Sequence, residues 1–540
     1  MSARTSELGP RPVLQAEAGA AAGVVDWPLE PSHGGGTFAG LLVWLRTRQL
    51  EVAMFAAALT PSVVVHAWGM HTFPAFFDDE GAYVSQAYAV DKLHALSPYT
   101  YWYDHPPLGW IVLGAWGSLA SLFSESSFTI AGARTFVFLL FVLSAALLYG
   151  IARRMSISPG LSALAVGLFG LSPLAVDYQR MVLLDNIAMP WLLAAIFFAL
   201  TPRRRVIAYA GAALCFVAAV LTKETYALCL PALVTLIWTS CPRSTRRFAI
   251  AVFGALALCV TAFYPLFALL RGELFPGRHH TSLIDGIRFQ LSRVGGGSAF
   301  ELHSATRHLI DTWLKLDPVL LMCAVLAIVP LLAVRRLRWI GLALAVPIAV
   351  ALRPGSYVPA MYVIALLPFA ALGLAALAAH ATAASRTEHR PAILRTALAT
   401  AAVLIVAVPA GIASATWIRP DSSMMRTNDT SGDRRAVEWL AAHAPRNSRV
   451  LVDATIWTDL VDRGFDRHRV VWFYKLDLDP AVSTPWWRFD YVVRSNLMAG
   501  NLDWLPRSRA VFDHSRIVAV FTTKDERIEV RRVLRPAARR

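Results

Sequence analysis

Apolar residues gather in long runs that recur from about residue 50 to residue 417. A helix needs about 20 consecutive apolar residues to cross the hydrocarbon core of a bilayer, and many of these runs approach that length. Charged and turn-forming residues separate them. The pattern predicts about eleven transmembrane helices, near residues 50–70, 133–151, 160–176, 187–201, 206–222, 226–240, 248–269, 318–334, 339–352, 357–379 and 394–417.

Residues 419–540 have a different pattern. A stretch with helical spacing, "RAVEWLAAHA", precedes five short β-rich runs: "RVLVDA", "RVVWFYKL", "DYVVRS", "SRIVAVFTT" and "IEVRRVL". Short strands that follow a helix and alternate with polar turns predict a small soluble α/β domain. Residues 1–45 are rich in Gly, Ala, Pro and Ser and lack the apolar core of a signal peptide. We expect them to form a disordered cytoplasmic tail.

Composition supports a membrane protein. The chain of 540 residues is 56% hydrophobic and only 16% charged, and its mean hydropathy is +0.50. A soluble chain of this length would be far more polar. All five cysteines lie in or beside apolar runs, so the spacing indicates neither a disulfide framework nor a CxxC metal site.

The net charge of +15 could indicate a nucleic-acid partner. The basic residues instead cluster in short segments between apolar runs: "RTR" at 46–48, "ARR" at 152–154, "RRR" at 203–205, "RSTRR" at 243–247, "RRLR" at 335–338 and "SRTEHR" at 385–390. This is the positive-inside pattern of cytoplasmic loops. It favours a lipid bilayer as the partner and argues against nucleic acid.

The basic clusters also predict the orientation of the chain. With the N-terminal tail in the cytoplasm, the loop after the first helix lies outside. Arg153 and Arg154 must lie inside again, so a single span separates them from that loop. We assign 133–151 as the span and 106–123 as an interfacial helix on the outer leaflet. The alternation then places the loop 271–315 and the C-terminal domain outside a multi-pass plasma-membrane protein.

With this orientation, charged residues from separate loops meet on the outer face. They are Asp78, Asp79, Glu80, Asp104, His105, Asp177, Arg180, Asp185, Lys223, Glu224, His279 and His280. Ionisable residues this close to hydrocarbon are costly and mark function or pairing. A carboxylate can act as a general base, and cations beside it can hold a phosphate. The combination predicts an enzyme that removes a sugar from a lipid-linked phosphate.

Four stretches in the first half of the chain resemble a known superfamily. They are "DDEGAY", "YDHPPLGW", "RTFVFLLFVLSAALLYGIARR" and "QRMVLLDNIAMP". In this order they resemble the GT-C superfamily of polytopic glycosyltransferases, in particular the protein O-mannosyltransferase and lipid A aminoarabinose transferase branch. The resemblance covers residues 50–240 and, in general layout, the later helices, and it implies a GT-C-like transmembrane catalytic domain at 46–418. The apolar runs and basic clusters give this domain outer loops at 71–132 and 271–315 and place the α/β domain at 419–540 outside.

The resemblance also implies roles for single residues. Asp79, of the Asp79–Glu80 pair, matches an acid that acts as the base or positions the acceptor, and Asp185 is expected near it. "DHPPL" matches a motif whose acidic residue, here Asp104, is sometimes a metal ligand. The lysine that contacts the phosphate in that motif is replaced by His105. A histidine in that place would have to be protonated or to help bind a metal.

Two further sets of residues complete this hypothesis. Lys223 and Arg180 are candidates for binding the donor phosphate. His279 and His280 could form a metal site with Asp104, because imidazole and carboxylate ligands suit zinc. Two adjacent histidines in a loop are more often ordinary loop residues, so a divalent metal remains an open alternative.

Each candidate also has an ordinary structural explanation. Asp79 and Glu80 could complement the dipole of a helix N-terminus, and Asp185 could be a helix cap. Arg180 could belong to a surface ion pair, which contributes little. Lys223 could mark a membrane boundary. Their common location on one face favours function.

We therefore predict a membrane glycosyltransferase that moves a sugar from a polyprenyl-phosphate donor by an inverting single displacement. The acceptor would be an extracytoplasmic glycan, lipid or protein hydroxyl of the cell envelope. The catalytic candidates are Asp79, Glu80 and Asp185, and the phosphate-binding candidates are His105, Lys223 and Arg180. A lipid-linked sugar transporter or flippase would need inverted repeats and midplane charges, which the sequence does not suggest. A membrane scaffold would not need the loop carboxylates.

Overall fold

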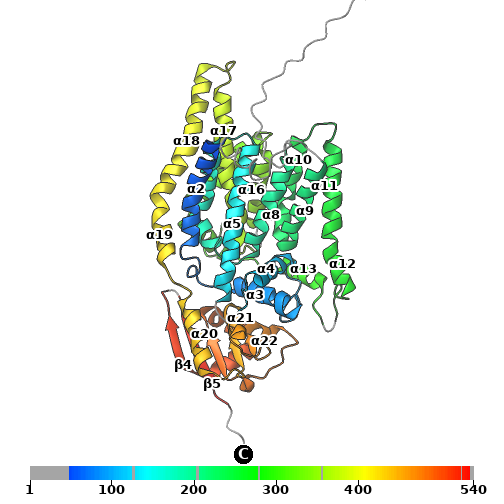
Figure 1. Ribbon diagram of the computed structural model, residues 1–540, viewed down its shortest axis with the longest axis vertical. Helices are drawn as coiled ribbons and strands as arrows, with labels where there is room; N and C mark the ends of the chain where they lie inside the picture. Colours follow the sequence, from blue (N-terminus) through cyan, green and yellow to red (C-terminus); the bar gives the residue numbers. More distant parts are fainter. Residues whose placement is uncertain are drawn as a thin grey trace, which may run out of the picture.

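The structure of the chain is a computed structural model that describes residues 48–124, 128–201, 206–277, 280–353, 355, 357–524 and 526–535. Helices dominate it, and a small sheet lies at one end (Figure 1). The predicted disordered tail at 1–45 and the basic cluster at 203–205 lie outside the described residues.

The predicted apolar runs form helices. These are α2 (Gln49–Ala67), α5 (Thr129–Arg154), α6 (Pro159–Gly170), α8 (Leu184–Ala199), α9 (Val206–Thr222), α10 (Leu230–Ser240), α11 (Arg246–Thr261), α12 (Phe263–Leu270), α15 (Pro318–Ala333), α16 (Arg338–Ala351), α17 (Leu367–Ser385) and α18 (Ala392–Thr416). Local signals set their ends. At the start of α6, the Ser158 hydroxyl accepts from the Leu161 N–H, and Pro159 occupies the first turn. No intrahelical partner is lost there, because the first turn has none.

Length and composition allow five helices among the described residues to cross a bilayer: Gln49–Ala67, Thr129–Arg154, Arg246–Leu270, Ala360–Ser385 and Ala392–Thr416. A sixth span results if α14 (Ala305–Leu316) and α15, which meet at 111°, form one broken segment. Five other apolar helices have only 10–17 residues. At a rise of about 1.5 Å per residue they fall short of the hydrocarbon thickness. The prediction of a helical membrane protein is confirmed, whereas the count of eleven spans is not.

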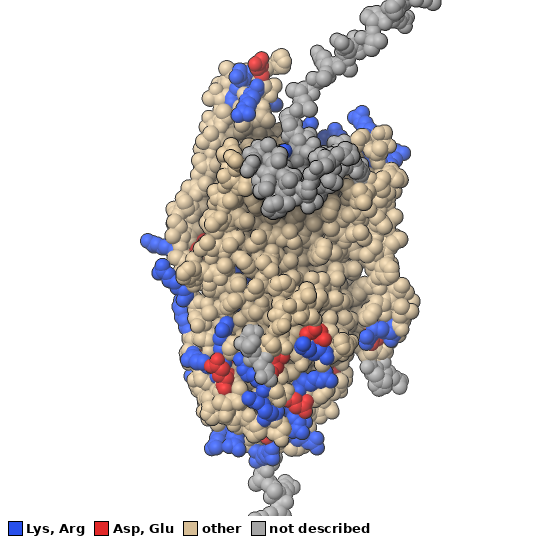
Figure 2. Space-filling view, viewed as in Figure 1, with Lys and Arg blue, Asp and Glu red and all other residues tan. Residues whose placement is uncertain are grey.

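The surface has the charge distribution that a membrane protein needs. Uncharged residues cover the broad middle of the molecule, whereas Lys and Arg lie at its upper end and over its lower part, where Asp and Glu join them (Figure 2). α2 and α18 lie on one flank of the helix bundle (Figure 1) and expose Val64, Val403 and Leu404. Contiguous exposed apolar surface of this kind suits contact with lipid.

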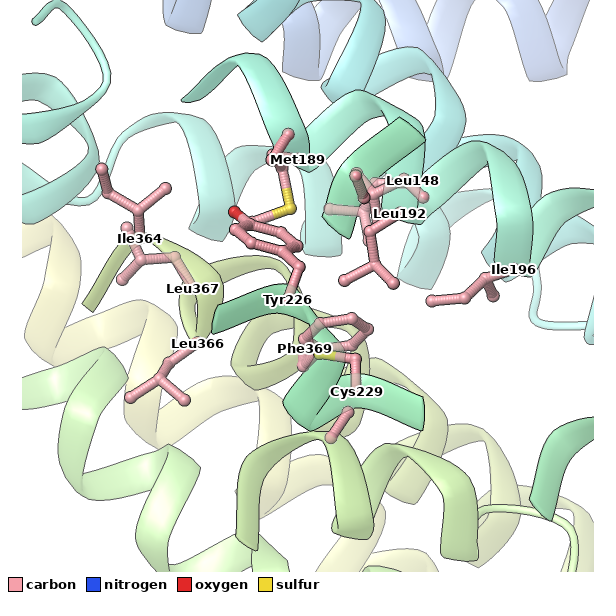
Figure 3. Packing of buried hydrophobic residues seen from close by; sticks show 14 of the residues in the cluster. Leu148, Met189, Leu192, Ile196, Tyr226, Cys229, Ile364, Leu366, Leu367 and Phe369 are labelled. Atoms are coloured by element: carbon pink, nitrogen blue, oxygen red, sulfur yellow. The ribbon is translucent and has the colours of Figure 1, made fainter. Parts of the chain in front are cut away.

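The centre of the bundle is a packed core to which α5, α8, α17 and the short helix η2 (Glu224–Cys229) contribute (Figure 3). Leu192, Tyr226 and Phe369 are buried there. The Tyr226 hydroxyl donates to the main-chain carbonyl of Asp185 at 2.8 Å. This bond satisfies the buried hydroxyl and ties η2 to the start of α8.

The C-terminal unit contains a sheet with the strand order β2-β1-β3-β5-β4. The strands are β1 (Val450–Val452), β2 (Val470–Trp472), β3 (Tyr491–Arg494), β4 (Ser515–Thr522) and β5 (Arg527–Val533), which coincide with the five β-rich runs. β1 runs parallel to β2 and β3, whereas β5 runs antiparallel to β3 and β4. Helices α20 (Ser431–His443), α21 (Ala454–Asp462), α22 (Phe473–Leu478), α23 (Asn496–Asn501) and α24 (Pro506–Asp513) accompany the sheet. The carboxyl ends of the three parallel strands lie at one edge, where α/β sheets bind ligands.

α3 (Asp78–Tyr88) joins the C-terminal unit to the helix bundle and lies between them in Figure 1. Gly81 permits this close approach, because a Cβ there would overlap the main chain at the start of α21. From α21, Asp459 Oδ1 accepts from the Thr129 N–H at 2.8 Å and from its hydroxyl at 3.0 Å. The C-terminal unit thus caps the N-terminus of α5, one of the long helices of the bundle.

The segment predicted to be interfacial forms α4 (Leu108–Leu119), which packs beside α3 (Figure 1). Trp110 is fully buried, and its ring stacks on that of Tyr83 with 6.4 Å between centroids. Leu119, at the other end, is exposed. α4 therefore supports α3 and the loop that carries His105.

Candidate active site

A cavity of about 460 Å³ lies between the helix bundle and the C-terminal unit. α3 and the loop up to His105 form one part of its wall. α13 (Leu283–Ser292) and the segment around Tyr357 form another, and the carboxyl ends of β1 and β2 with their following turns form a third. Of the residues that the sequence predicted for the site, the wall includes Asp79, Asp104, His105 and Lys223, but not Glu80, Arg180, Asp185 or His280.

Asp78 and Asp79 lie in the first turn of α3 and face the cavity. Burial raises the pKa of Asp79, against the lowering effect of the Lys223 charge. Burial and the Asp79 charge raise the pKa of Asp78 to about 7, although the Tyr474 hydroxyl donates to its carboxylate at 3.1 Å. A buried carboxylate with a raised pKa is suited to take a proton near neutral pH.

Lys223, His105 and Glu224 form a hydrogen-bonded row. Lys223 Nζ lies 3.0 Å from His105 Nε2, and His105 Nδ1 lies 2.9 Å from Glu224 Oε2. An ammonium can only donate, so the row fits an imidazole that accepts at Nε2 and donates its Nδ1 proton to Glu224. Burial is the largest single influence and works against the charge of Glu224, but the hydrogen bond from His105 and the Lys223 charge together lower its pKa to about 2.

The row gives His105 a role that the sequence did not suggest. The sequence required it to be protonated or to bind a metal, whereas here its ring holds the Lys223 ammonium at the cavity wall. A cation, the Lys223 ammonium, therefore lies directly beside position 105. Glu224 orients the ring from the other side.

Glu80 has different surroundings from Asp79. Its carboxylate is fully buried and accepts from Arg134 Nε at 2.9 Å and from Nη2 at 2.6 Å. The main-chain N–H groups of Phe77 and Val182 also donate to it, at 3.0 and 2.8 Å. Four hydrogen bonds leave no free acceptor for a substrate proton. We assign Glu80 a positioning role, in which it holds the start of α3 against α5.

Neither Arg180 nor Asp185 lines the cavity. The Arg180 guanidinium donates to the main-chain carbonyl of Trp68 at 3.0 Å and to that of Met424 at 3.4 Å. Asp185 is buried in the first turn of α8, and its carbonyl is the acceptor of the Tyr226 bond. The structure thus brings Asp79 together with His105 and Lys223 at the cavity wall. Asp185 lies behind that wall, close enough for the Lys223 and Glu224 charges to act on it, whereas Arg180 is bound to main-chain carbonyls.

The predicted metal ligands are not assembled. Asp104 lines the cavity, whereas His280 lies in a separate pocket with its Nε2 3.1 Å from the Phe275 carbonyl. His279 falls outside the described residues. In the part of the chain that the structure describes, no three His, Cys, Asp or Glu side chains are grouped to hold a metal ion. These residues do not fit the ligand set that a divalent metal requires.

Sequence reasoning missed a second cation in the cavity. Arg293 follows α13, and its guanidinium carbon lies 3.7 Å from the ring centroid of Tyr357. Both residues line the cavity. α13 can approach because Gly286 faces the main chain of Tyr103, which a Cβ would overlap. A basic residue two positions before the Gly295–Gly297 run was the signal in the sequence.

The C-terminal unit supplies residues that the sequence analysis also missed. Asp453 follows β1 directly, and Tyr474 and Lys475 follow β2. The Lys475 ammonium lies 3.2 Å from the ring centroid of Trp102, and burial lowers the pKa of Lys475 to about 8. The signal was present in "RVLVDA" and "RVVWFYKL", because polar residues directly after parallel strands share one edge of the sheet.

A comparison with protein families matches part of the chain. Residues 104–267 match the family model described as dolichyl-phosphate-mannose-protein mannosyltransferase. The matched range is less than half of the chain and contains Asp104, His105 and Lys223. No curated protein sequence gave a significant match.

Solved structures resemble the whole chain at low identity. ArnT from Cupriavidus metallidurans in the apo state is 16% identical, with 91% of this chain and 98% of that chain covered and a TM-score of 0.52. ArnT bound to undecaprenyl phosphate is also 16% identical, with 89% of this chain and 97% of that chain covered and a TM-score of 0.52. A third structure is the oligosaccharyltransferase AglB from Archaeoglobus fulgidus in complex with an inhibitory peptide and a dolichol-phosphate. It is 12% identical, with 83% of this chain and 70% of that chain covered and a TM-score of 0.51.

These findings agree with the motifs in the first half of the chain. At such identities the solved structures show a shared fold, and the family model indicates the class of enzyme. They confirm the resemblance to the GT-C superfamily and the prediction of a glycosyltransferase.

Proposed function

We propose that this protein transfers a sugar from a polyprenyl-phosphate donor to a hydroxyl of an extracytoplasmic acceptor, with inversion at the anomeric carbon. One observation carries the proposal: Asp79 lines the same cavity as the Lys223–His105 row, close enough for the Lys223 charge to act on it. The lipid-bound states of ArnT and AglB support a polyprenyl-phosphate as the donor class.

Asp79 is the proposed general base. The acceptor oxygen attacks the anomeric carbon while its proton passes to the Asp79 carboxylate. The raised pKa of Asp79, which burial causes, makes this carboxylate a stronger base than an exposed aspartate. Asp79 must be ionised to act, and the neighbouring Lys223 charge favours that form.

Lys223 and Arg293 are the proposed partners of the donor phosphate. As the new bond forms, the bond between the anomeric carbon and the phosphate oxygen breaks, and the electron pair stays on the phosphate. Cations fixed where this charge develops lower the barrier, because they need no reorganisation during the reaction. His105 and Glu224 act indirectly, by holding the Lys223 ammonium in place.

Asp79→Asn tests the proposal. We would delete the gene, express either the wild type or the variant, and compare envelope glycans and glycoproteins by mass spectrometry. The wild type should restore a glycosyl group that is missing from the deletion strain. The variant should lower the initial rate of transfer from a polyprenyl-phosphate sugar by about 10²–10⁴-fold, the range for a lost general base.

A matched control is Asp503→Asn, because this carboxylate is exposed and distant from the cavity wall. Asp503→Asn should transfer at the wild-type rate. Equal transfer by folded Asp79→Asn and wild-type protein would remove Asp79 as the base. A deletion strain without any change in its glycans would count against the proposed function itself.

A further inference from the structure

The part of the cavity wall that the C-terminal unit supplies is rich in carboxylates. Asp433 of α20, Asp453 after β1 and Glu526 before β5 all line the cavity, and Asp78 of α3 lines it too. We refer to these four residues as the acidic wall. They come from four separate elements, so no short sequence motif marks them.

Two buried acceptor atoms on the cavity wall have no hydrogen-bond partner among the described residues. They are Asp453 Oδ1 and Gln86 Oε1, and the two side chains are 5% and 9% exposed. Asp453 occupies the N-cap position of α21 but makes no capping bond. A buried acceptor without a donor is costly. Both atoms therefore point to a ligand that donates hydrogen bonds.

The charges around the acidic wall have one sign. Burial raises the pKa of Asp453 to about 8 despite the lowering effect of a hydrogen bond from Ser495, and the charges of Asp78 and Glu526 add to the increase. Burial also raises the pKa of Asp433 well above its usual range, with Glu526 and Asp453 as the strongest charges acting on it. Like charges this close disfavour ionisation unless a cation neutralises them.

Two cations beside this wall, Arg434 and Lys475, are engaged elsewhere. Arg434, beside Asp433 in the chain, donates to the His71 carbonyl at 2.6 Å and lies over the Phe128 ring. The Lys475 ammonium rests on Trp102. Neither residue forms an ion pair with the acidic wall among the described residues. A ligand could supply the missing positive charge.

Resting on the proposed function, we propose that the acidic wall binds a primary ammonium group carried by the acceptor molecule. The donor phosphate is anionic and suits the opposite wall, where Lys223 and Arg293 lie. An ammonium brings three N–H donors, which match the carboxylate oxygens of this wall and an unpartnered acceptor such as Asp453 Oδ1. The C-terminal unit would thus select acceptors by charge, while Asp79 acts on the acceptor hydroxyl.

The test uses the full chain in lipid nanodiscs and two probes of the same shape. Methyl 6-amino-6-deoxyglucoside carries an ammonium at pH 8, and methyl glucoside is neutral. Ligand-observed NMR titrations give both dissociation constants. We expect the amine to bind at least about tenfold more tightly, which corresponds to one charged hydrogen bond.

The variants locate this preference. Glu526→Gln, at a half-buried position in a turn, and Asp453→Asn should each reduce it several-fold. Asp503→Asn, an exposed change in the same unit, should leave it unchanged. Equal affinities of the wild type for the two probes would overturn the proposal. So would an unchanged preference in both acidic-wall variants when circular dichroism shows that they are folded.

Two further arms separate this inference from the proposed function. Undecaprenyl phosphate at saturation should leave the amine preference intact. If an undecaprenyl-phosphate amino sugar abolishes the preference while undecaprenyl phosphate does not, the wall holds the donor sugar and the proposal falls. Asp79→Asn should retain the preference and lose transfer. If transfer depends on Asp79 but the protein shows no preference for the amine, the proposed function stands. The proposal that the acidic wall binds an ammonium group is then refuted.

Discussion

The two sides of the cavity differ in the charges that surround their buried carboxylates. On the bundle side, Asp79 lies among cations, and the Lys223 ammonium is held by a row of hydrogen bonds that ends at Glu224. On the side of the C-terminal unit, Asp433 and Asp453 lie among carboxylates. Paired and oriented charges suit a reaction at an anionic donor. Unpaired charges of one sign suit the recognition of a cation.

The same contrast exists between two adjacent residues of the bundle side. Asp79 faces the cavity, whereas Glu80 is enclosed by Arg134 and two main-chain N–H groups. Burial alone therefore does not identify a catalytic carboxylate. The residue that is buried without full hydrogen bonding is the one available to a substrate.

The largest effect is expected from Glu80→Gln, which breaks the positioning pair. It removes the charge partner of the fully buried Arg134 guanidinium, and such a loss destabilises a protein by about 3–5 kcal/mol. Thermal unfolding of the purified protein in nanodiscs measures it. The matched control is Asp311→Asn, which breaks an exposed pair with Arg307 and should cost at most about 1 kcal/mol. Similar losses in both variants would refute the role of Glu80.

Lys223→Met should have the next largest effect. It removes one charged contact to the donor phosphate, so binding of undecaprenyl phosphate should weaken by about 10–100-fold. Isothermal titration in nanodiscs measures the affinity. Lys475→Met removes a cation from the other side of the cavity and should leave this affinity nearly unchanged. If both variants weaken the binding equally, the donor phosphate is not bound by the bundle side alone, and the proposed division between donor and acceptor sides is wrong.

Asp459→Asn should produce a smaller effect at the junction of the two sides. It weakens the cap that α21 places on α5 through Thr129, at a cost of about 1 kcal/mol. Hydrogen exchange should increase at the start of α5 and in α21 without global unfolding. The exposed Asp513 provides the control Asp513→Asn, for which no change is expected. Unaltered exchange in Asp459→Asn would show that the cap does not couple the two parts.

The smallest effect is a displacement of the pH profile. Asp79 acts in its ionised form, so the rate falls as the pH drops below its pKa. The Asp104 charge raises that pKa and the Lys223 charge lowers it. Asp104→Asn should therefore move the acidic limb of kcat/KM to lower pH, and Lys223→Met should move it to higher pH. If the acidic limb moved in the same direction in both variants, its assignment to Asp79 would be contradicted.

Three of the residues that the sequence singled out, Asp79, His105 and Lys223, line one cavity in the structure. Each follows or precedes an apolar run, and such ends gather at one membrane face. Arg180 was expected at the phosphate but binds main-chain carbonyls instead. The partners of a guanidinium depend on the packing of distant segments, which no local pattern contains. Arg293 was missed because its partner Tyr357 lies far along the chain.

The sequence by itself determined where helices and strands form, because hydrophobic periodicity and caps act over a few residues. It also determined that carboxylates end up beside the lipid-facing helices. Only the tertiary structure decided that, of three consecutive acids, Asp79 faces a cavity and Glu80 meets an arginine 54 positions away. The tertiary structure also joined strand ends of the C-terminal unit to that cavity. The reason is physical: the environment of a charge is set by whatever packs around it, and those groups come from all over the chain.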